Sequence, residues 1–196
     1  MCDLDDQARL AVYAEVTGHT PQEVSDAIWG SGLDLSSDRG DLTSAEFIAE
    51  ASKRLGTPLT ARLWADARKA GMPPNDEVVA IASRLTVPMA VLTNNGHILK
   101  EQIEHIFPEL ARLAGPHFYT SAEFKTFKPD PTIYLRCCER AGFEPSKTLF
   151  VDDRQENVEG ALEAGLMAHR YTTPSLLQDA LASVLTTGAL QGHNRA

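Results

Sequence analysis

The spacing of apolar residues divides the chain into an all-helical first part and a second part in which strands alternate with helices. Up to residue 72 the apolar positions follow the three-to-four-residue spacing of amphipathic helices, and no strand is expected there. Two capping boxes, each a threonine followed three residues later by a glutamate, mark helix starts after Thr20 and Thr43. The helices expected in this part span residues 5–17, 21–30, 44–56 and 59–70. We therefore predict a small helical domain over residues 5–72.

From residue 76 onward the pattern changes to short apolar runs without alternation, separated by helical segments. Such runs are typical of strands that are buried on both faces of a parallel sheet. The strands expected there span residues 87–92, 117–120, 148–151 and 167–171, and the helices span residues 76–85, 96–106, 131–141, 155–164 and 174–185. Alternating strands and helices predict a doubly wound parallel sheet, so the fold class is α/β over residues 76–186.

Composition narrows the possible partners and compartment. With 18 lysines and arginines against 27 aspartates and glutamates, the net charge is −9, which argues against nucleic acid or an anionic membrane as a partner. The three cysteines lack the spacing of a disulfide framework or a zinc site. The N-terminus has no apolar signal core, and no apolar run approaches the length of a membrane span. We therefore expect a cytoplasmic protein.

Polar residues follow the first expected strand directly, as Thr93, Asn94 and Asn95, with Gly96 and a helix after them. In doubly wound sheets, ligands bind beyond the carboxyl ends of the strands. A hydroxyl, amides and the free N–H groups of a helix start can together hold an anion. The alternative is an ordinary helix cap followed by a tight turn.

The second polar cluster is Lys128, which lies on a loop that Pro129 and Pro131 stiffen. An ammonium fixed at the edge of the sheet can neutralise phosphate oxygens or a carboxylate nucleophile. The alternative is a solvated surface lysine, which is where most lysines lie.

The third cluster is Asp152–Asp153, at the end of the strongest expected strand. Two adjacent carboxylates repel each other unless a hard cation lies beside them, and Mg²⁺ takes oxygen ligands from carboxylates, water and phosphate. The alternative is that both aspartates cap the following helix, for which one carboxylate would suffice.

The order and spacing of these clusters resemble the haloacid dehalogenase (HAD) superfamily. The matching stretches are VLTNN at 91–95, KPDPTIY at 128–134 and LFVDDRQENVEGALEAGL at 149–166. The helical segment before them resembles the small cap of that superfamily, so the resemblance covers essentially the whole chain. It implies a Rossmann-like core in which an aspartate attacks a phosphoryl group and water hydrolyses the resulting aspartyl-phosphate.

The resemblance also assigns roles to individual residues. Thr93, with Asn94 and Asn95 beside it, would bind the phosphoryl oxygens, and Lys128 would balance the charge of nucleophile and phosphate. Asp153 would be a direct ligand of Mg²⁺, with Asp152 as a direct or indirect partner. Asn157 would orient this acidic loop.

The function that the resemblance implies is a Mg²⁺-dependent phosphatase that acts on a small phosphorylated metabolite. A 2-haloacid dehalogenase is the nearest alternative. Displacement of halide from carbon needs no Mg²⁺, however, so a metal-binding acidic pair would have no function in such an enzyme. A non-catalytic binding protein of the same fold is the other alternative.

The family's nucleophile motif, an apolar strand that ends in two aspartates, is not matched before the helical domain. Asp3 and Asp5 could be that motif, with Asp3 as nucleophile and Asp5 as acid/base, although the apolar residues of a strand do not precede them. In the interpretation that we favour, they belong to the start of the helical domain. The first core strand and the nucleophile would then lie upstream of residue 1, in a chain that is shortened at its N-terminus.

Overall fold

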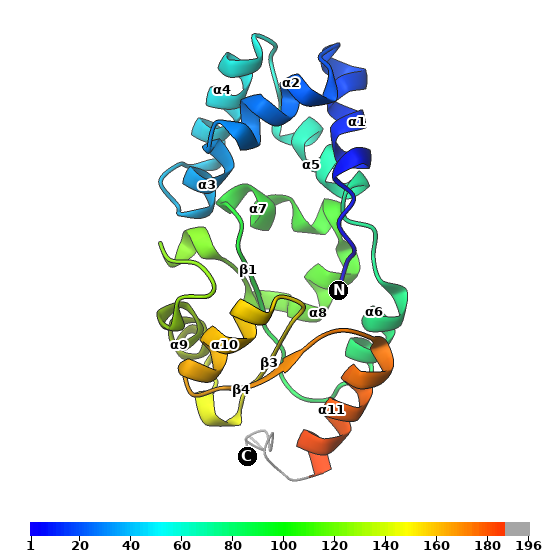
Figure 1. Ribbon diagram of the computed structural model, residues 1–196, viewed down its shortest axis with the longest axis vertical. Coiled ribbons are helices and arrows are strands. Elements are labelled where there is room, and N and C mark those ends of the chain that lie inside the picture. Colours follow the sequence, from blue (N-terminus) through cyan, green and yellow to red (C-terminus); the bar gives the residue numbers. More distant parts are fainter. Residues whose placement is uncertain (187–196) are drawn as a thin grey trace.

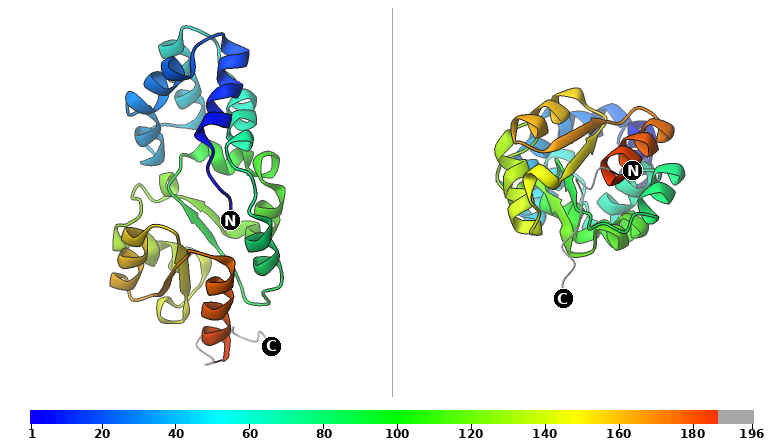
Figure 2. Two further views of the ribbon diagram at one scale, coloured as in Figure 1. Left: turned by 45° about the vertical axis from the view of Figure 1, so that its right-hand side comes forward. Right: turned by 90° about the horizontal axis from the view of Figure 1, so that it is seen from below.

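The computed structural model describes residues 1–186, which form a helical domain stacked on an α/β domain (Figure 1). The helices of the helical domain are α1 (Asp6–Thr17), α2 (Pro21–Ser25), a π-helical turn (Asp26–Gly30), α3 (Leu33–Asp38), α4 (Ser44–Leu55) and α5 (Ala61–Ala70). The N-terminus lies at the junction of the two domains (Figure 2). No described segment before β1 is a strand of a sheet, in agreement with the apolar spacing.

Local capping explains where these helices begin. In both predicted capping boxes the threonine side chain accepts the N–H of the third helical residue, while the glutamate accepts the N–H of the threonine. Helices α1 and α4 end at Gly18 and Gly56, which adopt the left-handed conformation. The sequence did not predict α3, nor the π-helical turn that replaces the second half of the expected helix over 21–30.

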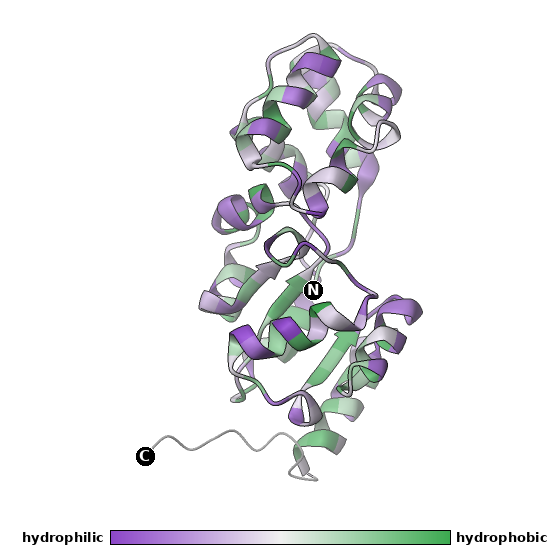
Figure 3. Cartoon of the chain, turned by 90° about the vertical axis from the view of Figure 1, so that its left-hand side faces the viewer, coloured by the Kyte–Doolittle hydropathy of each residue, from purple (hydrophilic) through white to green (hydrophobic). Residues whose placement is uncertain are grey.

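The α/β domain contains four parallel strands in two separate pairs. Strand β1 (Val91–Thr93) pairs with β2 (Phe118–Thr120), and β3 (Leu149–Asp152) pairs with β4 (Met167–Arg170). The helices around them are α6 (Asp76–Ser83), α7 (His97–Ile106), α8 (Pro108–Ala114), α9 (Pro131–Ala141), α10 (Gln155–Glu163) and α11 (Pro174–Thr186). The strands are mostly apolar, and polar residues gather on the outer helix surfaces (Figure 3).

Two expectations about the strands are wrong. The first strand covers only 91–93 instead of 87–92, because Pro88 cannot donate a ladder hydrogen bond. Strands β1 and β3 are only half-buried, whereas β2 is fully buried. Within residues 1–186, one edge of β1 and one edge of β3 pair with no other strand, which leaves both strands partly open.

The first residues run beside the linker between the two domains rather than beside a strand of the sheet. Cys2 forms an antiparallel bridge with Pro74, and the N–H of Asp3 donates to the carbonyl of Pro73. The Asp5 carboxylate caps α1 by accepting the N–H of Ala8 at 2.9 Å. Asp5 therefore caps a helix and Asp3 bonds to the linker, so neither lies at the end of a sheet strand, as the interpretation of Asp3 as nucleophile and Asp5 as acid/base required.

The apolar core is continuous between the two domains. One cluster of buried residues includes Tyr13 and Trp64 from the helical domain together with Leu99 and Phe118 from the α/β domain. Helix α7 packs against α5 and carries most of this contact. The boundary between residues 72 and 76 stays a prediction. None of the helices over residues 1–186 is both long and apolar enough to span a bilayer.

Candidate active site

A buried ion pair joins the second and third predicted clusters. Lys128 Nζ lies 2.6 Å from Asp152 Oδ2, and the two side chains are 10% and 9% exposed. Lys128 comes from the loop before α9, and Asp152 is the last residue of β3. The solvated-surface alternative for Lys128 is therefore wrong.

The second carboxylate oxygen of Asp152 is also occupied. Asp152 Oδ1 accepts hydrogen bonds from Asn157 Nδ2 at 2.9 Å and from the N–H of Arg154 at 3.0 Å. Burial raises the pKa of Asp152, but the ammonium of Lys128 and these hydrogen bonds outweigh it, so the pKa lies below its ordinary value. Asp152 is thus an ionised partner that fixes the position of Lys128. Asn157 orients the acidic loop, as the resemblance implied.

The backbone of Lys128 is held by Asn94. The Asn94 side chain donates to the Lys128 carbonyl and accepts the Lys128 N–H, both at 2.9 Å. The side-chain amide of Asn94 therefore positions the lysine, whereas the sequence had placed it on the phosphoryl oxygens. The first and second predicted clusters meet through this pair of hydrogen bonds.

Helix α10 supports the same loop from the other side. Gly160 lies so close to it that a Cβ atom there would come 2.0 Å from the carbonyl oxygen of Pro129. Because the contacted atom belongs to the backbone, a Cβ atom at this position would force the loop to move. Gly160 therefore contributes to the placement of Lys128.

The variant Gly160→Ala tests this support. Alanine in a helix interior normally stabilises by about 0.5–1 kcal/mol relative to glycine, but overpacking against Pro129 should cost about 1–3 kcal/mol. We expect a net loss of stability in urea unfolding. Glu163→Ala on the same helix is the control, because Glu163 is exposed. An increase in stability for Gly160→Ala would show that the loop adapts freely.

The polar loop after β1 forms its own network. Asn95 Nδ2 donates to Thr93 Oγ1 at 2.7 Å, and Asn95 Oδ1 accepts from Arg68 of α5 at 2.8 Å. Neither Thr93 nor Asn94 caps α7, whose first residue follows Gly96 without a side-chain cap. The capping alternative is therefore wrong, and the Thr93 hydroxyl keeps its own proton to donate to an anion.

Ser121 is a residue of this site that the sequence reasoning missed. Its hydroxyl accepts the N–H of Asn95 at 3.0 Å and donates to the carbonyl of Asp38 in the helical domain at 2.7 Å. Ser121 directly follows β2, so the rule that ligands and polar groups gather at carboxyl ends would have found it. The weak strand pattern hid this signal.

Asp153 differs from Asp152 because its carboxylate is exposed and has no hydrogen bond or ion pair within residues 1–186. Only its backbone carbonyl is used, as an acceptor for Arg170. The described residues contain no cluster of three or more histidine, cysteine or acidic side chains that could hold a metal by themselves. One free carboxylate still fits Mg²⁺, which often binds through one or two carboxylates and completes its shell with water and phosphate.

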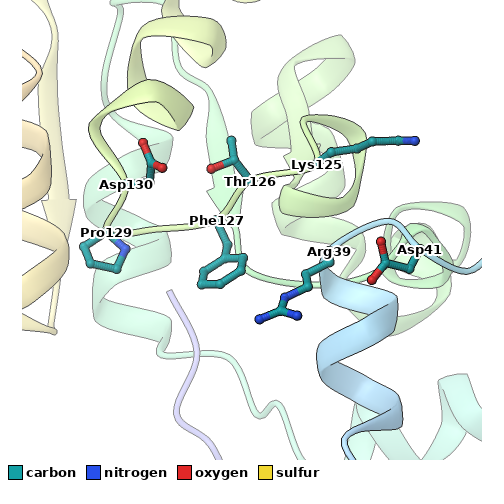
Figure 4. Close-up of a pocket in the computed structure, with 7 residues that line it drawn as sticks. All are labelled: Arg39, Asp41, Lys125, Thr126, Phe127, Pro129 and Asp130. Atoms are coloured by element: carbon teal, nitrogen blue, oxygen red, sulfur yellow. The ribbon is translucent and has the colours of Figure 1, made fainter.

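Two hollows lie near these residues. The larger, of about 350 Å³, lies between the loop over 125–130 and Arg39–Asp41 of the helical domain (Figure 4). The Phe127 ring faces Arg39 there at 5.7 Å, but none of the predicted site residues lines this hollow. The smaller is an interdomain cavity of about 130 Å³ whose wall includes Arg9, Trp29, Trp64, Asn94, Asn95 and Gly96.

Comparisons with known proteins agree with this architecture. A relative from Rattus norvegicus, N-acylneuraminate-9-phosphatase, is 30% identical over 109 residues, which cover 54% of this chain and 43% of the relative. The chain spans less than half the length of the curated relatives that it matches.

Solved structures share the fold. A HAD family enzyme from Bacteroides thetaiotaomicron, in complex with magnesium and inorganic phosphate, has a TM-score of 0.70 at 22% identity, covering 88% of this chain and 89% of that chain. L-2-haloacid dehalogenase from Xanthobacter autotrophicus has a TM-score of 0.57 at 18% identity, covering 96% and 80%. The predicted α/β fold with a helical cap is confirmed.

The family model of the haloacid dehalogenase-like hydrolases matches residues 34–165, from α3 to the end of α10. This range holds the polar residues after β1, the lysine loop and the acidic pair after β3. The chain therefore belongs to the haloacid dehalogenase-like hydrolases.

Proposed function

We propose that the chain carries the phosphoryl-binding site of a Mg²⁺-dependent phosphatase for a small phosphorylated metabolite. The observation that carries this proposal is the contrast between the two adjacent aspartates. Asp152 is committed to the largely buried Lys128, whereas the side chain of Asp153, the next residue, is exposed and has no partner within residues 1–186. A free carboxylate that directly follows the partner of a fixed ammonium in the chain suits a metal–phosphate pair better than a neutral substrate.

The residues after β1 would bind the phosphoryl oxygens. Thr93 offers a hydroxyl proton, and the start of α7 offers backbone N–H groups that have no acceptor within the helix. Lys128 would offset the negative charge that grows on the phosphoryl group during transfer. The hydrogen bonds that Lys128 makes with Asn94 and Asp152 fix the lysine in advance, so no reorganisation is needed when the substrate binds.

Asp153 would hold Mg²⁺ directly, and Asp152 would act on it only indirectly, because both of its oxygens are engaged. The ion would neutralise phosphate charge and orient the phosphoryl group. Asp152 and Asp153 are the only acidic side chains among the residues of β1–β4 and those directly after them within the described chain. We therefore assign to these residues the binding and charge balance of the phosphoryl group, and we name no nucleophile among them.

Relatives support the phosphatase over the dehalogenase. The relative from rat is named a phosphatase, and the Bacteroides enzyme was solved with magnesium and phosphate. The dehalogenase from Xanthobacter shares the fold at a lower TM-score, so halide displacement remains the second candidate.

Binding and turnover are measured separately. We expect inorganic phosphate to bind in calorimetry only when Mg²⁺ is present, and turnover of p-nitrophenyl phosphate to stop on addition of EDTA. Release of chloride from 2-chloropropionate that EDTA leaves unchanged would favour the dehalogenase. Phosphate binding without turnover of either ester or haloacid, in a form that also carries the nucleophile strand, would favour the non-catalytic alternative. Absence of both binding and turnover would contradict the proposal.

A further inference from the structure

The interdomain cavity contains charged groups that the phosphoryl site does not use. It lies between the helical domain and the loop after β1, and it shares Asn94 and Asn95 with that loop. A phosphoryl group at Thr93 would therefore leave the remainder of the substrate facing this cavity.

Arg9 is the most unusual residue of the cavity wall. The residue is 6% exposed, its guanidinium lies over the Trp29 ring at 4.3 Å, and it has no ion pair with a carboxylate in the described part of the chain. Its Nε is buried and no acceptor for it lies within residues 1–186, although the hydroxyl of the adjacent Tyr13 interacts with the guanidinium. A buried guanidinium nitrogen without an acceptor is costly, and a ligand that accepts a hydrogen bond from it would offset this cost.

The other unpartnered polar atoms on this wall are donors as well. The Nε of Arg68 and the Nε1 of Trp64 are buried and bond to no described residue. Both groups donate only, and neither can accept a hydrogen bond. A ligand rich in acceptor oxygens satisfies such a wall, whereas an amine or an alkyl group does not.

Two carboxylates in the same wall, Asp34 and Asp38, offset this positive charge only in part. Burial, and then the proximity of Asp34, raise the pKa of Asp38 to about 7, so Asp38 is only partly ionised at neutral pH. Burial lowers the pKa of Arg9 only to about 10, so its guanidinium stays charged. Burial likewise lowers the pKa of Arg68 and raises that of Asp34.

The volume limits the part of a ligand that the cavity can enclose. A cavity of about 150 Å³ holds one benzene molecule, or roughly six non-hydrogen atoms, and this cavity measures about 130 Å³. We propose that the Arg9 cavity binds the carboxylate of a small hydroxy acid, so that the substrate is the phosphate ester of such an acid. The assignment of the cavity to the substrate rests on the proposed phosphoryl site, but the binding of an acid does not.

Tryptophan fluorescence reports directly on this cavity, because the only two tryptophans in the sequence, Trp29 and Trp64, both line it. The probes are lactate, its uncharged isostere lactamide and the cation 1-amino-2-propanol. We expect saturable quenching by lactate alone. Inorganic phosphate with Mg²⁺ should leave the dissociation constant of lactate within about twofold, since the two subsites are separate.

Arg9→Met should weaken lactate binding at least about tenfold, since hydrogen bonds to charged groups are lost. Its stability should equal or exceed that of the wild type, because an unpartnered buried charge is replaced by a side chain of similar volume. Arg62→Met on α5 is the matched control, because Arg62 is exposed. If Arg9→Met does not fold, the comparison of lactate with lactamide on the wild type still tests whether the cavity binds a carboxylate.

Three results would overturn the inference: equal quenching by lactamide, quenching by the amine instead of the acid, or competition between phosphate and lactate. Absence of any quenching would also overturn it. All of these outcomes are measured by ligand binding and need no catalytic activity. Lactate binding without Mg²⁺-dependent phosphate binding would refute only the proposed function, and Mg²⁺-dependent phosphate binding without lactate binding would refute only the cavity assignment.

Discussion

Replacing Lys128 with methionine is expected to lower both the stability of the protein and its turnover of phosphate esters. The substitution leaves Asp152 buried without its cation, and loss of one partner of a buried ion pair costs about 3–5 kcal/mol. Asp152 keeps its hydrogen bonds from Asn157 and the Arg154 N–H, so we expect a loss of stability near the lower end of this range. Loss of charge balance at the phosphoryl group should lower kcat/KM by about 10³-fold.

The chain offers a matched control for this variant. Lys147 and Glu144 form an ion pair of 2.7 Å, close to the 2.6 Å of Lys128 and Asp152, but both side chains are 51% exposed. Lys147→Met should change the free energy of unfolding by less than about 1 kcal/mol. The double variant Lys128→Met/Asp152→Asn should regain stability, because it removes the uncompensated charge, but it should regain no activity. A loss of less than tenfold in kcat/KM for Lys128→Met would contradict the assigned role.

Helix ends and strand-end chemistry could be predicted because each depends on residues adjacent in sequence. Helix α9 covers the expected residues because Asp130 caps it, Pro131 begins it and Gly142 adopts the left-handed conformation after it. The position of the acidic pair followed from one rule, that side chains after parallel strands meet at one edge of the sheet.

The missed features depend on contacts between residues far apart in the sequence. Asn94 and Lys128 are 34 positions apart, and nothing in either segment shows that the amide binds the lysine backbone rather than phosphate. Arg9 lies on an amphipathic helix, where an arginine normally faces solvent, and only the packing of the helical domain buries it over Trp29. The sequence predicted that both tryptophans lie in the core of the helical domain. It could not show that they line a cavity, because the second domain forms part of the wall of that cavity.

Replacing Asp153 with asparagine is expected to remove Mg²⁺ binding while leaving the fold intact. The Asp153 side chain is exposed and has no hydrogen bond or ion pair in the described chain, so the free energy of unfolding should change by less than about 0.5 kcal/mol. Loss of an indirect partner of a metal typically costs 10–100-fold in affinity, and loss of a direct ligand should cost at least about 100-fold.

Calorimetric titration with Mg²⁺ in the presence of inorganic phosphate measures this affinity, and urea unfolding measures the stability of the same samples. Glu163→Gln on α10 is the control, because it removes an exposed carboxylate from the neighbouring helix and should leave both values unchanged. Asp152→Asn should instead lower stability as well as affinity, because Asp152 is the buried partner of Lys128. If Asp153→Asn bound Mg²⁺ as tightly as the wild type, the ion would have to be held elsewhere, and the free carboxylate after β3 would lose its role in phosphoryl transfer.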